Sequence, residues 1–507
     1  MFGRKNHCLD PFELLLCRVN LSGGTIRNPL KDKQKSFKWG MIAALCLTLI
    51  LPIGWGLLKR FEGEKPGNDL ILPKPVIGMT QSFSVVVSDR KTGLRRIRIE
   101  CIQGKTDHVL LDQEFPSTGF FRKGLVRDKN LVLTMEPRKL GLTDGNALIR
   151  STVWDFSCRN GGNGNPHVVE KVILIDTTPP DIRVLTNVHN ISQGGSSLII
   201  YRLSERCPRS GVHVGNAFYP GVGGFFEDPD LYLAMFALRI DQDRETGIYL
   251  GASDRAGNKS RAAFRHYIRL QRHPKDNIRI TDRFLKRKLP EFDAAPEKSP
   301  VEQFLFINRS LRASAYETLS KVVGAPSPLM LWSGPFLRLP GSARQSGFGD
   351  RRIYIHNGRE IDRQYHLGVD LASVKQSPVP AANHGKVVFA DALSIYGNSV
   401  VIDHGLGLHS MYAHLSRIDV KPNQTVDKGD IIGYTGSTGL AGGDHLHFSM
   451  LVQDTFVNPM EWWDAKWIEN NITRKIMSQR ATRRSGQTGN AGAGHNLSAG
   501  GSVERQQ

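Results

Sequence analysis

The chain has 507 residues, enough for three or four domains. It carries 67 Lys and Arg against 48 Asp and Glu, a formal net charge of +19. Just over half of this excess lies in residues 1–38 and 465–507, and no basic run is interleaved with aromatic residues as a nucleic-acid-binding surface requires. The charge distribution therefore argues against nucleic acid as a partner and favours attraction to an anionic cell wall or membrane surface.

Near the N-terminus, residues 39–58 form a stretch of 20 residues without a charged side chain. This length can cross a bilayer, and Trp39 and Trp55 lie near its ends, as interfacial aromatic residues do. The basic segment 1–38 precedes it, so the positive-inside rule places that segment in the cytoplasm. We expect a single-pass anchor in the inner membrane with the rest of the chain in the periplasm. A cleaved signal peptide is the alternative, but no A-x-A-like site follows the apolar run.

Residues 70–175 and 178–273 have alternating apolar runs separated by Gly, Asp and Asn turns, which predicts strands throughout. A weak repeat relates them, since Trp154-Asp-Phe-Ser is echoed by Ala252-Ser-Asp-Arg-Ala-Gly-Asn. Two such units are similar to tandem immunoglobulin-like β-sandwiches. Their simplest role is to space and orient the following domain. Docking of a wall polymer or an envelope protein is the alternative.

Two cysteines of the first predicted sandwich alternate with apolar residues that face its core. Cys101 follows Ile97 and Ile99, and Cys158 follows Trp154 and Phe156, in each case at a spacing of two. In an oxidising compartment these thiols could form a disulfide. Buried free thiols are the alternative, and the sequence leaves both open.

Residues 276–330 change to a helical pattern. Ser299 and Glu302 form a predicted capping box around a proline, and Gly324 provides a stop. We expect a short helical linker packed on one of its neighbours. A regulatory alternative has residues 325–344 lying across a cleft, in which case deleting the linker would raise activity.

The most informative motifs come next along the chain. If His366-Leu-Gly-Val-Asp370 forms a strand, His366, Gly368 and Asp370 lie on one face of it. If His445-Leu-His447 forms a second strand, both of its histidines also share one face. Nitrogen and carboxylate donors thus converge from two strands, each backed by an apolar stripe. Zinc favours these donors, and a catalytic zinc site keeps three protein ligands and one open position.

Around these motifs the sequence resembles the lysostaphin-like (LytM-type) zinc metalloendopeptidases, which cut peptide bonds of bacterial peptidoglycan. The resemblance follows family order through residues 346–352, 397–405, 411–416, 428–433 and 458–459. It implies an antiparallel β peptidase domain over residues 335–470 and one Zn²⁺ per chain. It also implies that His366, Asp370 and His447 are the zinc ligands and that His414 and His445 are catalytic histidines that do not bind the metal.

The residue chemistry agrees with this resemblance. Two neutral imidazoles and one carboxylate leave zinc with net positive charge, so the ion can lower the pKa of water and polarise a carbonyl group. His414 and His445 titrate in the range needed for proton transfer, and which of them acts as base stays open. The spacing of the remaining histidines of this region demands no chemistry, and we expect structural or surface roles for His356, His384, His404 and His409.

The sequence thus predicts a mainly β chain with a membrane-anchored zinc endopeptidase acting on peptidoglycan. The bond could be a D-amino-acid cross-link, a stem-peptide bond or a glycine bridge. The alternatives are a non-catalytic activator of other wall hydrolases, a structural wall tether and a peptidase of other proteins. Residues 485–507 are rich in Gly, Ser and Ala, which predicts a flexible tail.

Overall fold

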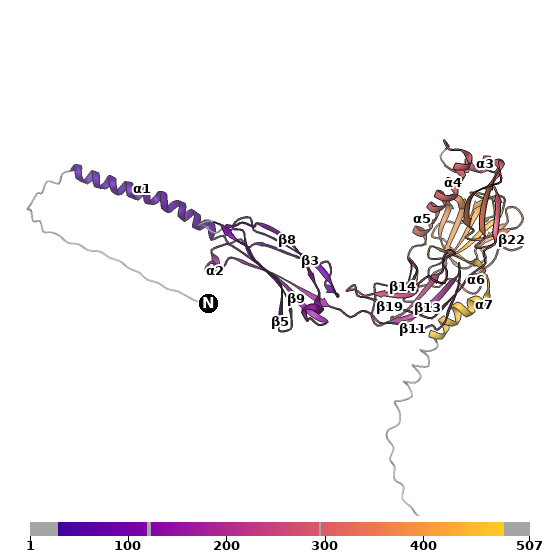
Figure 1. Ribbon diagram of the computed structural model, residues 1–507, viewed down its shortest axis with the longest axis horizontal. Helices are drawn as coiled ribbons and strands as arrows, with labels where there is room; N and C mark the ends of the chain where they lie inside the picture. Colours follow the sequence, from indigo (N-terminus) through magenta and orange to yellow (C-terminus); the bar gives the residue numbers. More distant parts are fainter. Residues whose placement is uncertain (1–28, 119–122, 294–295, 481–507) are drawn as a thin grey trace, which may run out of the picture. The chain divides into compact units, whose positions relative to one another are not determined.

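The computed structural model of the chain describes residues 29–118, 123–293 and 296–480 (Figure 1). The tail predicted over 485–507 and most of the segment 1–38 lie outside the described residues. Contacts within the chain separate two compact units. The first contains residues 1–72, 83–133 and 148–171, and the second contains residues 73–82, 134–147 and 172–507.

The first unit begins with helix α1 (Pro29–Arg60), which includes the predicted membrane span 39–58. Apolar side chains along it are exposed, among them Trp39, Ile50 and Trp55. Within the described part of the chain, however, no helix combines the length and apolar character needed to cross a bilayer. The predicted transmembrane helix is therefore not confirmed, although its residues are helical.

The strands of the first unit follow the predicted alternation. Strand β4 (Leu94–Gln103) pairs antiparallel with β5 (Thr106–Glu114) and with β9 (Gly145–Asp155), while β1 (Gly67–Ile71) pairs with β3 (Gln81–Ser88), which neighbours β8 (Asp128–Met135). Alternate side chains of β3 and β4 are buried, as expected for strands with one face in a core.

Cys101 and Cys158 are both free thiols in the structure. Cys101 lies in β4 and is fully buried, so burial raises the pKa of its thiol to about 11. Cys158 lies beyond the end of β9, next to the short helix α2 (Arg159–Gly162), and is half-buried. The predicted alternation of buried and exposed side chains therefore ends before Cys158, so the two thiols do not point into one core. The disulfide between them is not formed.

The first part of the second unit contains two four-stranded sheets over the residues predicted as the second sandwich. One has the order β11 (Ile182–Val184), β13 (Ser196–Leu203), β17 (Leu231–Ala237) and β16 (Val222–Gly223). The other has the order β15 (Ala217–Pro220), β14 (Arg209–Val214), β18 (Ile248–Ser253) and β19 (Lys259–Ala262). The parallel pair of β12 (His189–Ser192) and β20 (His266–Arg269) completes this part.

The weak sequence repeat has a structural counterpart at the end of one strand in each unit. The carboxylate of Asp155 accepts hydrogen bonds from the backbone and side-chain nitrogens of Asn165, and the carboxylate of Asp254 accepts the same two bonds from Asn258. Such bonds satisfy buried polar groups where a strand turns. The immunoglobulin-like assignment of the two parts stays a prediction.

An antiparallel sheet occupies the range predicted for the peptidase domain. Its order is β22 (Ala343–Ser346), β25 (Val369–Ala372), β33 (Leu446–Val452), β29 (Leu408–Leu415), β28 (Asn398–Asp403), β27 (Gly385–Ala392) and β31 (Thr425–Val426), with β34 (Thr455–Val457) paired to β33. Strands β26 (Pro378–Pro380), β32 (Ile431–Tyr434) and β30 (Arg417–Ile418) form a second, smaller sheet.

The predicted helical linker is in part a strand. Residues Lys275–Arg279 form β21, which pairs parallel with β23 (Arg351–His356), and β23 pairs in turn with β24 (Arg359–Tyr365). Helices α3 (Asp282–Lys288), α4 (Pro300–Phe306) and α5 (Arg312–Val323) follow and lie along one side of the peptidase strands, with a π-helical turn Ile307–Leu311 between the last two (Figure 1). The capping box of Ser299 and Glu302 is confirmed. The prediction of helix from residue 276 is wrong, because sheet pairing outweighs local pattern there.

Residues 325–344 do not cover a cleft. Trp332 and Phe336 are buried against Trp462, and the backbone N–H of Leu331 donates to the carbonyl of His404. Among the described residues, none of this stretch lines the pocket that holds the predicted site. The stretch is held by packing, so the regulatory alternative in this form is wrong.

One hydrophobic core continues from the second predicted sandwich into the peptidase domain. At this junction the carboxylate of Glu461 accepts hydrogen bonds from the backbone nitrogen and the hydroxyl of Ser196. The hydroxyl of Tyr219 donates to that of Thr455. These two parts of the second unit are therefore packed as one body around the sheet that carries the predicted site.

Candidate active site

The two sequence motifs meet on neighbouring strands. Strands β25 and β33 pair antiparallel with Asp370 directly opposite His447. His366 precedes β25, and its backbone N–H donates to the carbonyl of Asp350. A side chain at Gly368 would lie 2.5 Å from His447 Nε2, so the glycine leaves room for that ring. The alternation predicted from the sequence places these groups on one face of the sheet.

Three donor atoms converge at this point. His366 Nε2 lies 2.9 Å from Asp370 Oδ1 and 3.0 Å from His447 Nδ1, and His447 Nδ1 lies 2.8 Å from the same carboxylate oxygen. All three side chains are buried. Two imidazole nitrogens and one carboxylate oxygen at these separations match the donor set of a catalytic zinc site, so the residues fit the metal.

The outer atoms of the same rings are held by further groups. His366 Nδ1 lies 2.8 Å from the carbonyl oxygen of Gly347, and His447 Nε2 lies 3.1 Å from the hydroxyl of Ser449. Such partners fix which ring nitrogen faces a metal. Burial lowers the pKa of His447 to about 4, which keeps its imidazole neutral, as a ligand must be.

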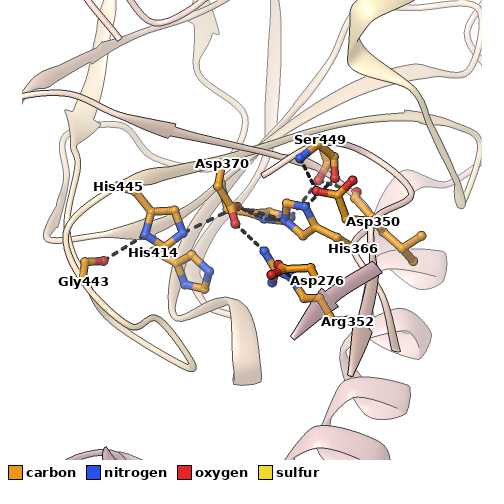
Figure 2. A network of polar contacts seen from close by, with 12 residues as sticks. Asp276, Asp350, Arg352, His366, Asp370, His414, Gly443, His445 and Ser449 are labelled. Carbon is orange, nitrogen blue, oxygen red and sulfur yellow. Dashed lines mark hydrogen bonds and ion pairs between the residues drawn. The ribbon is translucent and has the colours of Figure 1, made fainter. Parts of the chain in front are cut away.

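A cation also contacts the carboxylate. Arg352 of β23 donates to Asp370 Oδ2 at 2.5 Å, while the other oxygen faces the histidines (Figure 2). The guanidinium therefore fixes the orientation of Asp370 and leaves Oδ1 for the metal side. The sequence analysis did not assign a role to Arg352, because the pairing depends on how β23 lies beside β25.

The two predicted catalytic histidines lie beside this donor set (Figure 2). The rings of His414 and His445 are 4.9 Å apart, and His445 Nε2 lies 3.5 Å from Asp370 Oδ1. His414 Nδ1 lies 2.8 Å from the carbonyl oxygen of Thr438, and His445 Nδ1 lies 2.9 Å from that of Gly443. Both rings thus have one nitrogen anchored to a backbone carbonyl, and the second nitrogen of His445 faces Asp370.

The environments of these histidines differ. Burial drives the pKa of His414 well below its ordinary value. Burial also lowers the pKa of His445, but its hydrogen bond to Asp370 and the charge of that carboxylate outweigh this effect and raise the pKa overall. His414 has φ of +62°, a backbone conformation that costs a non-glycine residue free energy. Such strain is typical of positions held in place for function.

The site opens into a pocket of about 410 Å³. Two of its walls come from residues 350–365 and 435–444, which contribute Arg352, Tyr354 and residues 440–444. The sequence analysis missed the wall that comes from the preceding segment, which includes Ile278, Phe284 and Arg312. It also missed Tyr396, whose ring lies 5.5 Å from that of His447. None of these residues carries a motif, because tertiary packing alone brings them to the site.

The histidines expected to be structural lie elsewhere. His404 is buried, with Nδ1 2.7 Å from the carbonyl oxygen of His384 and Nε2 2.7 Å from the hydroxyl of Ser410. Burial lowers its pKa to about 3. His409 is buried as well, and His356 Nδ1 lies 2.9 Å from the carbonyl oxygen of Ile280. None of the four lines the pocket.

Comparison with known proteins assigns this part of the chain to a class. Residues 364–459 match Peptidase family M23, so the chain contains an M23 metallopeptidase domain at its C-terminal side. The family resemblance drawn from the sequence is confirmed.

Three curated relatives share this region. The DD-carboxypeptidase/endopeptidase Mpg of Neisseria meningitidis serogroup B is 38% identical over 95 residues, which is 19% of this chain and 22% of the relative. The peptidoglycan DD-endopeptidase ShyA of Vibrio cholerae serotype O1 is 36% identical over 129 residues, 25% of this chain and 29% of the relative. The glycyl-glycine endopeptidase ALE-1 of Staphylococcus capitis is 32% identical over 133 residues, 25% and 35% of the two chains. The similarity thus spans between about a fifth and a third of each relative.

Proposed function

We propose that this protein is a zinc-dependent endopeptidase that hydrolyses peptide bonds of peptidoglycan. The observation that carries the proposal is the convergence of His366 Nε2, Asp370 Oδ1 and His447 Nδ1 within about 3 Å of one another inside an M23 domain. These residues would bind one Zn²⁺ per chain. When bound, zinc would lower the pKa of a water molecule and polarise the carbonyl group of the substrate.

The other residues of the site would handle protons and charge. His414 and His445 each have one ring nitrogen bonded to a backbone carbonyl, so the other nitrogen of each is oriented toward the reacting groups. One would accept the proton of the attacking water, and the other would stabilise the negative charge that develops on the carbonyl oxygen. Arg352 would hold Asp370 as a ligand.

A D-amino-acid cross-link is the bond that we favour. Mpg and ShyA are named for DD-specific activity, and ALE-1 for cleavage of glycyl-glycine bonds. The first two are more similar to this chain in sequence identity. A non-catalytic activator is the second candidate of the sequence analysis, but such a protein has no need for the five side chains that the pocket retains.

We further propose that the protein acts outside the cytoplasm, in the periplasm, with residues 39–58 holding it to the inner membrane. The support is the uncharged stretch itself, its exposed apolar side chains and the extracytoplasmic position of peptidoglycan. Extraction of a membrane fraction with alkaline carbonate tests the anchor. Retention in the membrane is expected, and release of the intact chain would contradict it.

Digestion of intact peptidoglycan tests the activity. The full chain, its His447→Ala variant and a chelator-treated sample would be compared, with released muropeptides identified by mass spectrometry. We expect new peptide ends with the untreated wild-type chain alone. Activity that survives both the substitution and the chelator would overturn the proposal, and binding without cleavage by all samples would support the activator.

A further inference from the structure

The wall contributed by β21 and α5 has an electrostatic feature that the catalytic residues do not use. Arg279 and Arg312 both line the pocket, and they come from these two separate elements. Arg279 is exposed and Arg312 is half-buried. Among the described residues, no carboxylate lies within 4.0 Å of either guanidinium, which is the distance of an ion pair. Two cations thus face the pocket without an anionic partner.

The surroundings of Arg312 show why its charge stays unbalanced. Its Nε and one terminal nitrogen donate to the backbone and side-chain oxygens of Asn308, at 3.0 and 2.6 Å. Asn308 is neutral and donates to Asp362, and that carboxylate is already paired with Arg309 at 3.0 Å. Asn308 therefore orients Arg312 without neutralising it. A guanidinium has five N–H donors, so others remain for a ligand.

The charged side chains that line the pocket have a net positive charge. Its lining includes three arginines and two aspartates, and the pair of Arg352 and Asp370 offset each other. Asp444 is then the remaining carboxylate among the described lining residues, and it accepts hydrogen bonds from Thr435 and from the backbone of Gln376. A bound divalent cation would add to this excess. A half-buried arginine in such a site is the residue type that binds a carboxylate through paired hydrogen bonds.

Arg312 also lines the same pocket as the catalytic groups. Burial raises the pKa of Tyr396 well above its ordinary value, and the charges of both Arg312 and Arg352 act on the same hydroxyl to lower it. The ring of Tyr396 lies 5.5 Å from that of His447. Arg312, Tyr396 and the donor set thus line the same pocket.

We propose that Arg312, assisted by Arg279, forms a carboxylate-binding subsite that selects peptides with a free carboxylate next to the cleaved bond. This inference rests on the proposed endopeptidase function and narrows its substrate. A cross-link through a diamino dicarboxylic acid carries such a carboxylate beside the amide, whereas a polyglycine bridge carries none. Arg312 acts here as a specificity residue for the substrate and takes no part in proton transfer.

The test uses a matched pair of cross-linked peptides that differ at one group. One has a free carboxylate on the residue that supplies the amine of the cleaved bond, and the other has that carboxylate amidated. With the full-length zinc-loaded chain, we expect kcat/KM to favour the free carboxylate by about 10- to 100-fold, the scale of hydrogen bonds to a charged group. Arg312→Gln should lose this preference through KM, and Arg279→Gln should lose part of it. Arg312→Lys keeps the positive charge but lacks the planar guanidinium that can form two parallel hydrogen bonds. This variant should therefore retain an intermediate preference for the free carboxylate.

Arg283→Gln is the control, because Arg283 is an exposed arginine of α3 outside the pocket. It should behave as the wild type. Equal cleavage of both peptides by the wild type would overturn the subsite, as would an equal loss on both peptides in a folded Arg312→Gln protein, with folding checked by its melting temperature. If neither peptide is cleaved, the proposed endopeptidase fails instead. In that case the same two peptides are made uncleavable by reducing the amide, and their binding is measured by calorimetry. Tighter binding of the free-carboxylate peptide would support the subsite, and equal binding would overturn it.

Discussion

The floor and the wall of the pocket are built in different ways. The floor comes from β25 and β33, where Asp370 and His447 lie opposite each other in one antiparallel pair. The imidazole of His447 contacts the carboxylate of Asp370 directly. This wall comes from β21, α3 and α5, and in the described part of the chain its residues Arg279 and Arg312 have no carboxylate within ion-pair distance. In our proposals the floor holds a metal and activates water, whereas the wall selects the peptide.

The two regions also differ in how far the sequence predicts them. Side-chain alternation within the two motifs predicts that their histidines and Asp370 converge on one site before any fold is known. The choice of His366, Asp370 and His447 as the ligands comes from the family resemblance. His414 could be named by family resemblance only, since its position depends on a positive φ and on the loop at Thr438.

The wall could not be predicted in this way. Residues 276–279 were expected to belong to the helical linker, but they join a sheet with β23, a partner that lies more than 70 residues along the chain. Arg312 has the pattern of a solvent-exposed helix position until α5 packs beside the site. Strand pairing over such a distance in sequence produces no local periodicity that a reader of the sequence could detect. The helices could therefore be predicted, but not which of their residues line the pocket.

The largest effect on activity is expected when a proposed zinc ligand in the floor of the pocket is removed. Asp370→Ala should abolish zinc binding and lower kcat/KM by at least about 10³-fold, the scale for a group that acts as part of a catalytic unit. Elemental analysis and muropeptide release measure the two effects on one sample. Asp254→Ala is a suitable comparison, because Asp254 is a buried carboxylate outside the pocket. An Asp370→Ala protein with full zinc content would contradict the ligand assignment.

His414→Ala separates catalysis from metal binding on the same floor. We expect zinc content to stay at one per chain while kcat falls by about 10²- to 10⁴-fold, the range for loss of a general acid or base. Elemental analysis together with cleavage kinetics distinguishes this from the effect of Asp370→Ala. Loss of zinc in parallel with activity would show that His414 supports the metal instead.

A smaller effect is expected from the groups that orient the ligands. Ser449→Ala removes the hydroxyl 3.1 Å from His447 Nε2, so zinc affinity should fall by about 10- to 100-fold. Competition with a chelating dye measures this affinity. Ser399→Ala is the control. It removes another buried hydroxyl, which donates to the backbone carbonyls of two residues that are not ligands, so the zinc affinity should stay unchanged. Equal affinity in both variants would mean that Ser449 does not orient His447.

The last prediction concerns stability rather than activity, at the junction that supports the floor. Burial raises the pKa of Glu461 to about 8, so between its ordinary pKa of 4.5 and this value the folded protein binds more protons than the unfolded chain. Stability should therefore fall as pH rises through this window, by at most about 1.4 kcal/mol per pH unit. Gln cannot ionise, so Glu461→Gln should gain stability over the wild type from pH 5 to pH 8 in urea unfolding. The exposed Glu317→Gln is the control, and parallel pH profiles of wild type and Glu461→Gln would contradict the shift.

Zinc titration into the metal-free full-length chain tests the central claim most directly. Cleavage of a cross-linked muropeptide dimer would be followed as zinc is added in fractions of one equivalent. Our account predicts that the rate rises in proportion to zinc and reaches its plateau at one zinc per chain, with no rise in the Asp370→Ala protein. Full activity of the metal-free wild type, or a zinc-dependent rise in the Asp370→Ala protein, would contradict it.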